Sequence, residues 1–471
     1  MKRAKLCGLL LTTGLAMPAV AQDNLQTLQG MQRTDSTFTN IEQTGATAES
    51  LKAVLPHIKV PDGFEASLYA VVPDARSMAV APQGTVVFVG TRKDKVWSVV
   101  DRDRNRVADE VKDFAPSLTF DIPNGPCFSP DGFLYVAERN RVLSFPAAEF
   151  FFEGPDPAVD VVVAQGELVP PEEESFNHTA RVCRIGPDGK LYISLGQPYN
   201  VQPMEKLEKY DQAGIGGIIR MNTDGSEREV FTRGIRNSVG HDFNPANGDL
   251  WFTDNQVDGM GDDIPPGELN RQIEAGQHFG FPWTNSNVEI EDFKDVPRPE
   301  GVSFTEPQVE MDAHAADLGM SFYRGNSFPE DFHGGIFSAQ HGSWNRTEPV
   351  GARVMFTRLN ADGTAAGTEV FADGWLNKET GEYRGRPMDV AFLPDGSMLI
   401  SDDFAGAIWR IAYTGGESIN TRSAEQPGAA EAPSASSDTA AAPGAGTGPD
   451  EAEAAGDGDN DEAEASEAPA N

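Results

Sequence analysis

Short runs of alternating apolar and polar residues recur between Pro61 and Tyr413, and each run follows a turn of the Pro-Asp-Gly kind. Alternation with a period of two predicts β-strands that bury one face, and glycine in the turn tolerates the positive φ of a tight hairpin. The turns and the strands after them fall at 80–84 and 86–88, 128–132 and 134–136, 185–189 and 191–193, 243–248 and 250–252, and 392–396 and 398–400, with a degenerate copy at 328–337.

Six copies spaced by about 50–85 residues are typical of a repeat-built β fold. Long stretches with helical periodicity are absent from the same part of the sequence. The pattern therefore predicts an all-β chain that folds as a six-bladed β-propeller. We expect residues 59–413 to form this propeller. Residues 22–58 form an N-terminal arm that we expect to be loose from Gln22 to Glu49 and to make one or two helical turns from Ser50 to Leu55.

The widest gap between copies contains an acidic loop that is interrupted by glycine and proline. Asp262 and Asp263 stand side by side in it, close to Pro265 and Pro266, and no packing rule asks for adjacent carboxylates there. Hard oxygen ligands on an irregular backbone suit Ca²⁺. Insertions into repeats collect on one face, often the binding face. We therefore predict a metal site at Asp262 and Asp263.

A second acidic loop offers a weaker metal signal. Asp101, Asp103, Asn105 and Asp109 alternate as in a short calcium loop, but Lys112 occupies the position of the bidentate glutamate and a central glycine is absent. A solvated hairpin turn explains this loop better.

Three further stretches carry side chains suited to chemistry. His178 precedes the third copy. Histidine titrates near neutrality and can take a proton from a hydroxyl group, which indicates a general base. A histidine with a purely structural role is the alternative. Arg236 and Asn237 lie in a glycine-bounded turn and offer a bidentate cation with an amide; the alternative is a turn in which Asn237 caps the backbone. Arg384 and Arg386 precede the last copy and indicate either an anion site or a solvated loop.

The segment 340–346 is dense in polar groups and is a further candidate for the same mouth of the propeller. Its sequence, QHGSWNR, follows an apolar strand segment.

The two ends of the chain differ in composition from the propeller, and the first predicts the cellular location. A basic start, an apolar core and the triplet Ala19-Val20-Ala21 predict a secretory signal peptide at residues 1–21, and hence a periplasmic or secreted protein. Residues 414–471 are acidic and lack aromatic side chains, so we predict a disordered tail. No apolar stretch is long enough to span a membrane. Cys127 and Cys183 remain after cleavage, either as a disulfide or as two buried thiols.

The formal net charge of −36 argues against nucleic acid and anionic lipid as partners. The acidic folded part fits a salty environment or a cationic protein partner, and a generic solvated surface explains it equally well. No CxxCH haem motif occurs, so any electrons released in a reaction would go to an external acceptor, a cytochrome or a quinone.

Several motifs together resemble one family. GIRNSVG, LWFTDN, GDDIPPGELN, HFGFP, PDGKLYIS, AQHGSWNR and GRPMDVAFLPDGSMLISDD are similar to the sorbosone/glucose dehydrogenase group, whose members are exported six-bladed propellers that use pyrroloquinoline quinone (PQQ). The resemblance covers residues 61–413. It implies oxidation of an aldose or a sugar aldehyde by hydride transfer to PQQ, with Ca²⁺ as the clamping metal.

The resemblance also assigns roles to residues. It implies that His178 is the general base, that Arg236 and Asn237 lie beside the PQQ carbonyls, and that Arg386 binds a PQQ carboxylate. We therefore expect Arg236 to act in catalysis as well as in cofactor binding, and Arg384 to bind the cofactor with Arg386. Arg353 is the candidate for the basic residue expected in the fifth blade. Two alternatives stay open on the same fold: a Ca²⁺-dependent lactonase or related hydrolase, and a non-catalytic propeller that binds a ligand.

Overall fold

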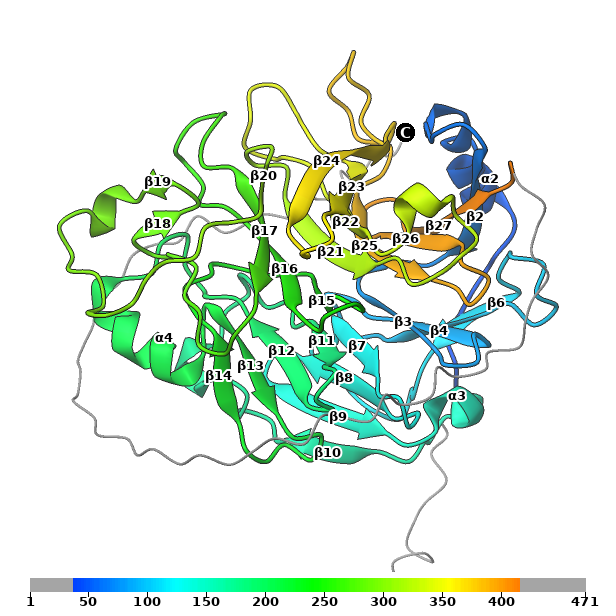
Figure 1. The fold of residues 1–471 in the computed structure, drawn as a ribbon. Coiled ribbons are helices and arrows are strands. Elements are labelled where there is room, and N and C mark those ends of the chain that lie inside the picture. Colours follow the sequence, from blue (N-terminus) through cyan, green and yellow to red (C-terminus); the bar gives the residue numbers. More distant parts are fainter. Residues whose placement is uncertain (1–36, 416–471) are drawn as a thin grey trace, which may run out of the picture. The chain divides into compact units, whose positions relative to one another are not determined.

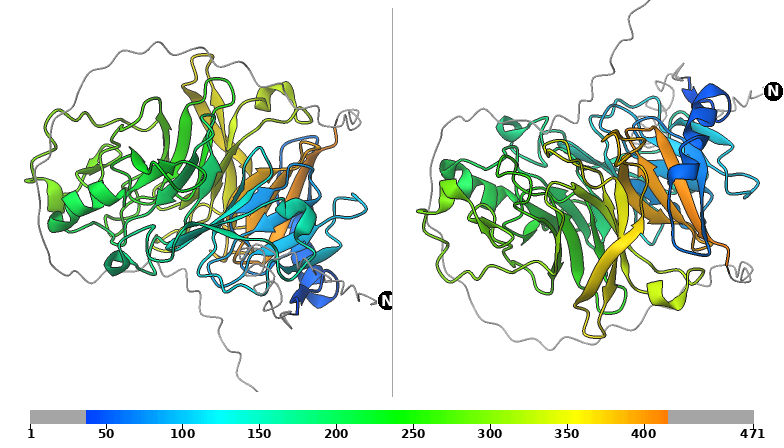
Figure 2. Two further views of the ribbon diagram at one scale, coloured as in Figure 1. Left: turned by 90° about the horizontal axis from the view of Figure 1, so that it is seen from below. Right: turned by 90° about the horizontal axis from the view of Figure 1, so that it is seen from above.

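Six antiparallel sheets are arranged around a common axis in residues 37–415, the part of the chain that this computed structural model describes (Figure 1). Each sheet begins near the axis and ends at the rim in the view of Figure 1, and Figure 2 shows the same sheets from two other sides. The innermost strands contact one another in a closed circle, in the order β3, β7, β11, β15, β21, β25 and back to β3. The predicted six-bladed β-propeller is therefore confirmed.

Each blade has four strands, and the first has a fifth. The first three blades contain β3 (Met78–Val80), β4 (Val86–Val89), β5 (Trp97–Val100), β6 (Glu110–Asp113) and β1 (Asn40–Ile41); β7 (Gly125–Phe128), β8 (Leu134–Glu138), β9 (Arg141–Phe145) and β10 (Asp160–Val163); and β11 (Cys183–Ile185), β12 (Leu191–Leu195), β13 (Gly217–Met221) and β14 (Glu229–Thr232).

The last three blades follow the same order from axis to rim. They contain β15 (His241–Phe243), β16 (Leu250–Asp254), β17 (Gly267–Gln272) and β20 (Val309–Met311); β21 (Asp317–Phe322), β22 (Ile336–Gln340), β23 (Arg353–Leu359) and β24 (Ala365–Ala372); and β25 (Pro387–Phe392), β26 (Met398–Asp402), β27 (Ala407–Tyr413) and β2 (Phe64–Val71). A small hairpin, β18 (Thr284–Asn285) and β19 (Val288–Glu289), lies outside the blades.

The repeated turns join the first and second strands of the blades. The turn 128–132 connects β7 to β8, and the turn 185–189 connects β11 to β12. Gly132 and Gly189 have φ of +88° and +74°, and a Cβ at either position would meet no atom within 4 Å. The left-handed backbone, and not crowding, therefore requires glycine at these two turns.

Both ends of the propeller sequence meet in the sixth blade. β2 pairs with β27 in antiparallel register from Phe64↔Tyr413 to Val71↔Ala407, so the start of the propeller supplies the outermost strand of a sheet whose other strands come from its end. This strand closes the ring. The tail predicted at residues 414–471 lies outside the described residues apart from its first two, and the predicted signal peptide at residues 1–21 lies outside them entirely.

The N-terminal arm differs from the expectation of a loose segment. β1 adds a strand to the first blade, and the helix α2 (Ala46–Lys52) buries Ala48 and Leu51 in a core cluster that also contains Trp375. These apolar side chains fix the described part of the arm onto the propeller. The burial of one leucine side chain stabilises the folded state by about 1.5–3 kcal/mol.

Helices are short and few among residues 37–415. Besides α2 they are α3 (Ala148–Phe151) and α4 (Leu207–Ala213), with single 3₁₀ turns η1 (Leu55–His57), η2 (Pro171–Glu173), η3 (Met204–Lys206), η4 (Glu291–Phe293) and η5 (Glu330–Phe332). None of the described helices has the length and apolar character that crossing a bilayer requires.

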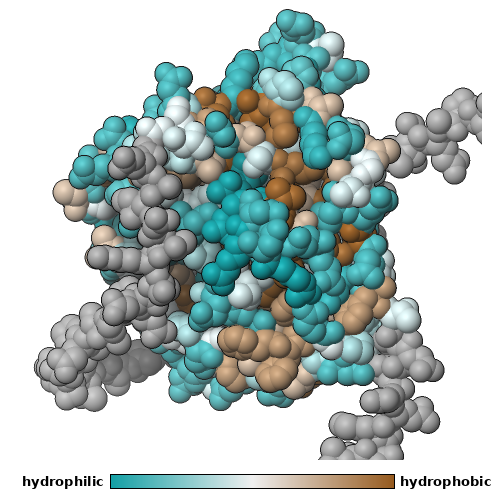
Figure 3. All heavy atoms as spheres, turned by 90° about the vertical axis from the view of Figure 1, so that its right-hand side faces the viewer, coloured by the Kyte–Doolittle hydropathy of each residue, from teal (hydrophilic) through white to brown (hydrophobic). Residues whose placement is uncertain are grey.

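Apolar side chains fill the spaces between neighbouring blades. One cluster places Phe88, Phe114 and Phe145 in edge-to-face contact between the first two blades. The face seen in Figure 3 is hydrophilic over much of its area, with several apolar patches.

The cysteine pair that the sequence left open is a disulfide, which joins Cys127 on β7 to Cys183 on β11 and so links the second blade to the third.

Candidate functional site

Polar side chains gather at one end of the axis, just before the innermost strands of several blades. Arg76 precedes β3, His178 precedes β11, Asn237 precedes β15 and Arg386 immediately precedes β25. They line one cavity of about 60 Å³. The full lining is Arg76, Arg92, His178, Thr179, Ala180, Asn237, Val239, Asn255, Ala316, Leu318, His341, Trp344 and Arg386.

His178 is held in one orientation. Its Nδ1 lies 2.5 Å from the carbonyl oxygen of Gln197, an atom that only accepts, so Nδ1 is the ring nitrogen that donates and Nε2 is the one left for exchange of a proton. The residue is buried and has a φ of +52°, a strained backbone for a residue other than glycine. An imidazole that is oriented in this way suits a general base.

Gly196 permits the close approach of His178 and Asn237. A Cβ at position 196 would collide with the Oδ1 of Asn237 and with the backbone and Cβ of His178. The Oδ1 of Asn237 is buried and has no hydrogen-bond partner in the described part of the chain. A buried amide oxygen without a partner at a cavity wall is the kind of group that a ligand satisfies.

Asp254 fixes the backbone that carries Arg236 and Asn237. Its two carboxylate oxygens accept the backbone N–H of Arg236 at 2.8 Å and of Asn237 at 2.6 Å. Asp254 ends β16 and lies opposite Glu268 of β17 in the sheet. Burial, together with the neighbouring Glu268 carboxylate, raises the pKa of Asp254 well above its usual range. The carboxylates of Asp254 and Glu268 repel each other when both are ionised, so the state in which the pair holds one proton is favoured.

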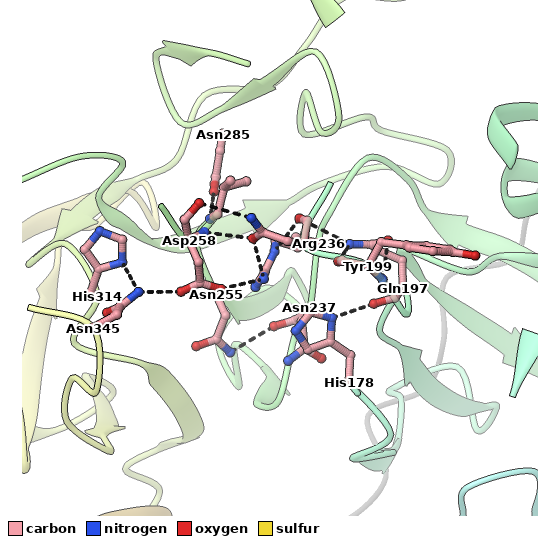
Figure 4. A network of polar contacts seen from close by, with 12 residues as sticks. His178, Gln197, Tyr199, Arg236, Asn237, Asn255, Asp258, Asn285, His314 and Asn345 are labelled. Atoms are coloured by element: carbon pink, nitrogen blue, oxygen red, sulfur yellow. Dashed lines mark hydrogen bonds and ion pairs between the residues drawn. The ribbon is translucent and has the colours of Figure 1, made fainter. Parts of the chain in front are cut away.

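The Arg236 guanidinium points into a network beside the cavity, as Figure 4 shows. It donates to the Asn200 carbonyl oxygen at 2.9 Å and to the Asn200 Oδ1 at 3.0 Å, and it forms an ion pair with Asp258 at 3.0 Å. Asp258 in turn accepts from Asn345, whose amide also contacts His314 (Figure 4). Arg236 is thus a neighbour of the cavity and not part of its lining.

A cluster of basic side chains from the lining surrounds one carboxylate, that of Asp403, which is not itself among the lining residues. Arg76 forms an ion pair with Asp403, and His341 Nε2 lies 2.7 Å from the same carboxylate. Burial alone would raise the pKa of Asp403, but His341 and Arg76 together hold it well below its usual range. Arg386 donates to the carbonyl oxygens of His341 and Gly342. Asp403 thus stays ionised and orients Arg76 and His341.

Asp402 supports Arg386 in the same way that Asp254 supports Arg236. Its carboxylate accepts the backbone N–H of Arg386 at 2.9 Å, the N–H of Ala405 at 2.8 Å and the indole N–H of Trp409 at 2.9 Å. Burial raises the pKa of Asp402 to about 6 despite these hydrogen bonds. Two blades therefore place a buried aspartate at the end of their second strand as a clamp for the mouth.

Two arginines that we expected at the site lie elsewhere. Arg384 lines a separate depression together with Tyr383 and Phe404. Arg353 donates to Gln340 at 2.6 Å and is neutralised by an ion pair with Asp312. Neither side chain reaches the cavity that contains His178, so their role in cofactor binding stays a prediction without support from their position.

The acid pair of the predicted metal site is also outside this cavity. Asp262 accepts the backbone N–H of Thr347 at 3.1 Å and, through its carbonyl oxygen, a hydrogen bond from Arg346. Asp263 lies 3.5 Å from Arg346 with 92% of its side chain exposed. The two carboxylates therefore do not converge, and a Ca²⁺ site formed by both remains a prediction.

The other acidic loop brings its carboxylates closer together. Oxygens of Asp101, Asp103 and Asp109 lie within 4.8 Å of one another. Backbone N–H groups of the same loop already donate to all three, including Asn105 N–H to Asp101 and Asp103 at 3.0 Å each. This geometry agrees with the solvated turn that the sequence favoured.

Three groups of the site were missed in the sequence. Arg76, Arg92 and Asp403 carry no local motif, although Arg76 stands just before an innermost strand, as His178, Asn237 and Arg386 do. That shared position was the available signal. Trp344 lies within the segment 340–346, which we placed at the mouth, and its indole is 46% exposed at the rim.

Comparison with known proteins gives this site a context. Residues 162–343 match the family described as Glucose / Sorbosone dehydrogenase, which confirms the resemblance drawn from the motifs. An uncharacterized protein of Borreliella burgdorferi is 37% identical over 248 residues, which are 52% of this chain and 62% of that protein. The aldose sugar dehydrogenase YliI of Escherichia coli is 24% identical over 263 residues, 51% of this chain and 62% of that enzyme.

A fungal enzyme supplies both a sequence and a solved structure. The pyrroloquinoline quinone-dependent pyranose dehydrogenase of Coprinopsis cinerea is 24% identical over 284 residues, 49% of this chain and 37% of that enzyme. The holo structure of its PQQ domain superposes with a TM-score of 0.62 at 17% identity, over 75% of this chain and 97% of that domain, which shows a shared fold. The matched segments thus span less than two thirds of these curated relatives.

Proposed function

We propose that this chain, which carries a glucose/sorbosone dehydrogenase family region at residues 162–343, is a periplasmic or secreted oxidoreductase that oxidises an aldose or a sugar aldehyde with PQQ as cofactor. The observation that supports this proposal most is the convergence of His178, Asn237 and Arg386 with Arg76 on one cavity. The names of the relatives, an aldose sugar dehydrogenase and a PQQ-dependent pyranose dehydrogenase, agree with it.

The residues of the cavity fit this cofactor by their chemistry. PQQ is a tri-acid, and the guanidinium groups of Arg76, Arg92 and Arg386 line the cavity, whereas no carboxylate is among its lining residues. The unpartnered Oδ1 of Asn237 awaits a donor. A volume of about 60 Å³ equals the share of two water molecules in the liquid, so a tricyclic ligand would lie mostly across the mouth, against the exposed indole of Trp344.

Each residue of the site has a separate role in the proposed reaction. PQQ, when bound, supplies the acceptor for the hydride. His178 takes the proton of the substrate hydroxyl at Nε2, because its Nδ1 is committed to the Gln197 carbonyl oxygen. The arginines offset the negative charge of the ligand, and Asp254 and Asp402 keep the backbone of the mouth in place.

The lack of a carboxylate in the lining also bears on the lactonase alternative. A Ca²⁺-dependent hydrolase needs a metal held at the axis by acidic side chains. The lining offers three arginines instead, and although Asp403 already pairs with Arg76, the excess of guanidinium groups favours binding of an anionic cofactor. Ca²⁺ remains part of the proposal as a separate requirement, tested by removal of the metal with a chelator and its return.

The experiment adds PQQ, with and without Ca²⁺, to the cofactor-free protein and follows the absorbance of the bound quinone. We expect a bound spectrum that bleaches with an aldose. His178→Asn, chosen because asparagine tolerates the left-handed backbone at this position, should bind PQQ normally and lose turnover by about 10²–10⁴-fold.

The exposed His57, changed to Asn, is the matched control and should behave as the parent protein. If no quinone binds, the redox proposal fails. If His178→Asn turns over at the parental rate, His178 is not the base.

A further inference from the structure

A second cavity, of about 510 Å³, opens beside α4 and β14 and is covered by residues from the segment 276–302. α4, β14 and the β18–β19 hairpin lie on the same side of the ring in all views (Figures 1 and 2). Its walls are mainly apolar and include Ile215, Val230, Ile235, Phe281, Trp283 and Pro297. The volume lies within the range of small-molecule sites.

One buried polar side chain in this cavity has an unused donor. His278 is 92% buried, and its ring stacks on Phe304 with centroids 4.8 Å apart. Its Nδ1 accepts the backbone N–H of Gly280 at 3.1 Å, so the neutral ring carries its proton on Nε2. Among residues 37–415 no hydrogen-bond partner of Nε2 is present, and His278 lines the cavity.

The pKa of His278 keeps its ring neutral, with the proton on Nε2 available to donate a hydrogen bond. Burial is the main cause that lowers the pKa of His278 to about 4; Arg233 lowers it further, and Asp211 opposes both. The ring is therefore neutral at physiological pH. Arg233 and Asp211 form an ion pair at the edge of the cavity and cancel each other's charge. An anionic or cationic ligand gains little from such surroundings.

The composition of the walls narrows the ligand further. The lining also includes polar side chains such as Gln202, Glu208 and Thr232, but its larger part is apolar, so several hydroxyl groups of a sugar would lie against apolar side chains, which is costly. A flat, mostly apolar ring would pack against Phe281, Trp283 and Pro297. A carbonyl oxygen on that ring would accept the proton of His278 Nε2.

We propose that this cavity binds a small quinone, with His278 Nε2–H donating to one quinone oxygen and with Trp283 and Phe281 packing on the ring. The assignment of a quinone rests on the proposed function, because a dehydrogenase needs an external electron acceptor. Oxidation of the substrate releases two electrons and two protons, and a quinone that takes both leaves as its quinol, so the exchange is balanced.

The position of the cavity suits this role. Ile235 forms part of its wall, and Asn237, two residues later, lines the cavity at the axis. The two cavities therefore share the short backbone segment 235–237. Arg236 lies between them, and Asp254 holds its backbone N–H.

The test uses the cofactor-free full chain and menadione as the probe, with isothermal calorimetry as the main measurement. We expect one saturable site per chain, accompanied by quenching of tryptophan fluorescence that is reduced in Trp283→Phe. His278→Phe keeps an aromatic ring beside Phe304 and removes the donor, and it should weaken binding by about tenfold or more. Val302→Trp, at an exposed position of the rim, should block the cavity without disturbing the core.

His333→Phe is the matched control, because His333 lies outside both cavities and bonds to the Phe328 carbonyl oxygen. It should bind menadione as the parent does. PQQ added at saturation should leave menadione binding unchanged. The proposal is overturned if menadione does not bind saturably, if Val302→Trp and His278→Phe both bind as the parent does, or if PQQ displaces menadione. PQQ binding is measured separately, so failure of the proposed function and failure of this site are distinguishable.

Discussion

The carboxylate of Asp254 accepts a hydrogen bond from the backbone N–H of Asn237 at 2.6 Å, across the join between the second strand of one blade and the loop before its first strand. Asp402 has the same relationship to Arg386 two blades later, at 2.9 Å. Both aspartates are buried and both end the second strand. The mouth of the propeller is thus held by carboxylates that never reach the cavity themselves.

Asp254→Ala should destabilise the protein and weaken PQQ binding together. The change leaves the buried N–H groups of Arg236 and Asn237 without partners, at a cost of about 2–5 kcal/mol, and relief of the contact with Glu268 offsets part of it. Urea unfolding and a PQQ titration measure the two effects. Asp224→Ala, in an exposed hairpin turn, is the control and should change the free energy of unfolding by less than about 0.5 kcal/mol. Equal stability of the two variants would show that Asp254 does not clamp the mouth.

Arg236 and Asp258 should behave as a coupled pair. Arg236→Met leaves the partly buried carboxylate of Asp258 with fewer partners, and we expect a loss of about 3 kcal/mol in the free energy of unfolding. Asp258→Asn in the same chain should recover part of this loss. A double-mutant cycle should give a coupling energy of about 0.5–3 kcal/mol. Additive single effects would mean that the ion pair contributes nothing.

Reduction of the Cys127–Cys183 bond should loosen the contact between the second and third blades. The two cysteines are 56 residues apart, and a closed loop of that size predicts about 4 kcal/mol of stabilisation, mainly through the unfolded chain. The variant with both cysteines changed to serine should therefore unfold at lower urea concentration. Addition of a reductant should destabilise the parent and leave this variant unchanged. A parent protein that is insensitive to reductant would contradict the expectation.

His241 should make the protein sensitive to mild acid. It is fully buried on β15, and burial, helped by Arg184, lowers its pKa from 6.5 to about 3. A lowered pKa means that the contribution of His241 is complete above pH 6.5 and is lost as the pH falls toward 3. Between pH 8 and pH 5 the parent should lose about 2 kcal/mol through this residue.

The comparison variant for this effect is His241→Gln, which carries no titrating ring. The difference in unfolding free energy between pH 8 and pH 5 should shrink by about the same 2 kcal/mol in this variant. An unchanged pH profile would exclude His241 as the source. His57, which is exposed, should show no such effect when it is changed to Gln.

The fold followed from the sequence because its signal is local and repeated. Turn glycines such as Gly132 and an alternating strand mark each first hairpin, and six such hairpins imply six blades. His178, Asn237 and Arg386 were found because they stand beside these hairpins. The partners of a side chain in the folded protein could not be predicted in the same way, because they come from distant parts of the sequence. Arg353 is neutralised by Asp312, 41 residues away in the sequence, and no spacing rule shows this.

The acid pair illustrates the same limit. Two adjacent carboxylates indicate charge at a place in the sequence and say nothing about direction. In the structure the carboxylate of Asp262 accepts the backbone N–H of Thr347, whereas the carboxylate of Asp263 is largely exposed beside Arg346. Arg76 illustrates the converse, since a lone arginine in a loop becomes part of a cavity only because Asp403, from the other end of the chain, lies beside it.

The pairing of β2 with β27 has a consequence for biosynthesis. Phe64 is made early and its partner Tyr413 is made 349 residues later, so the nascent propeller has an unpaired outer strand until almost the whole domain has left the ribosome. Contacts of such separation are slow to form and leave strand edges exposed in the meantime. Truncations that stop before residue 407 should therefore accumulate as aggregates, however well their first five blades are formed.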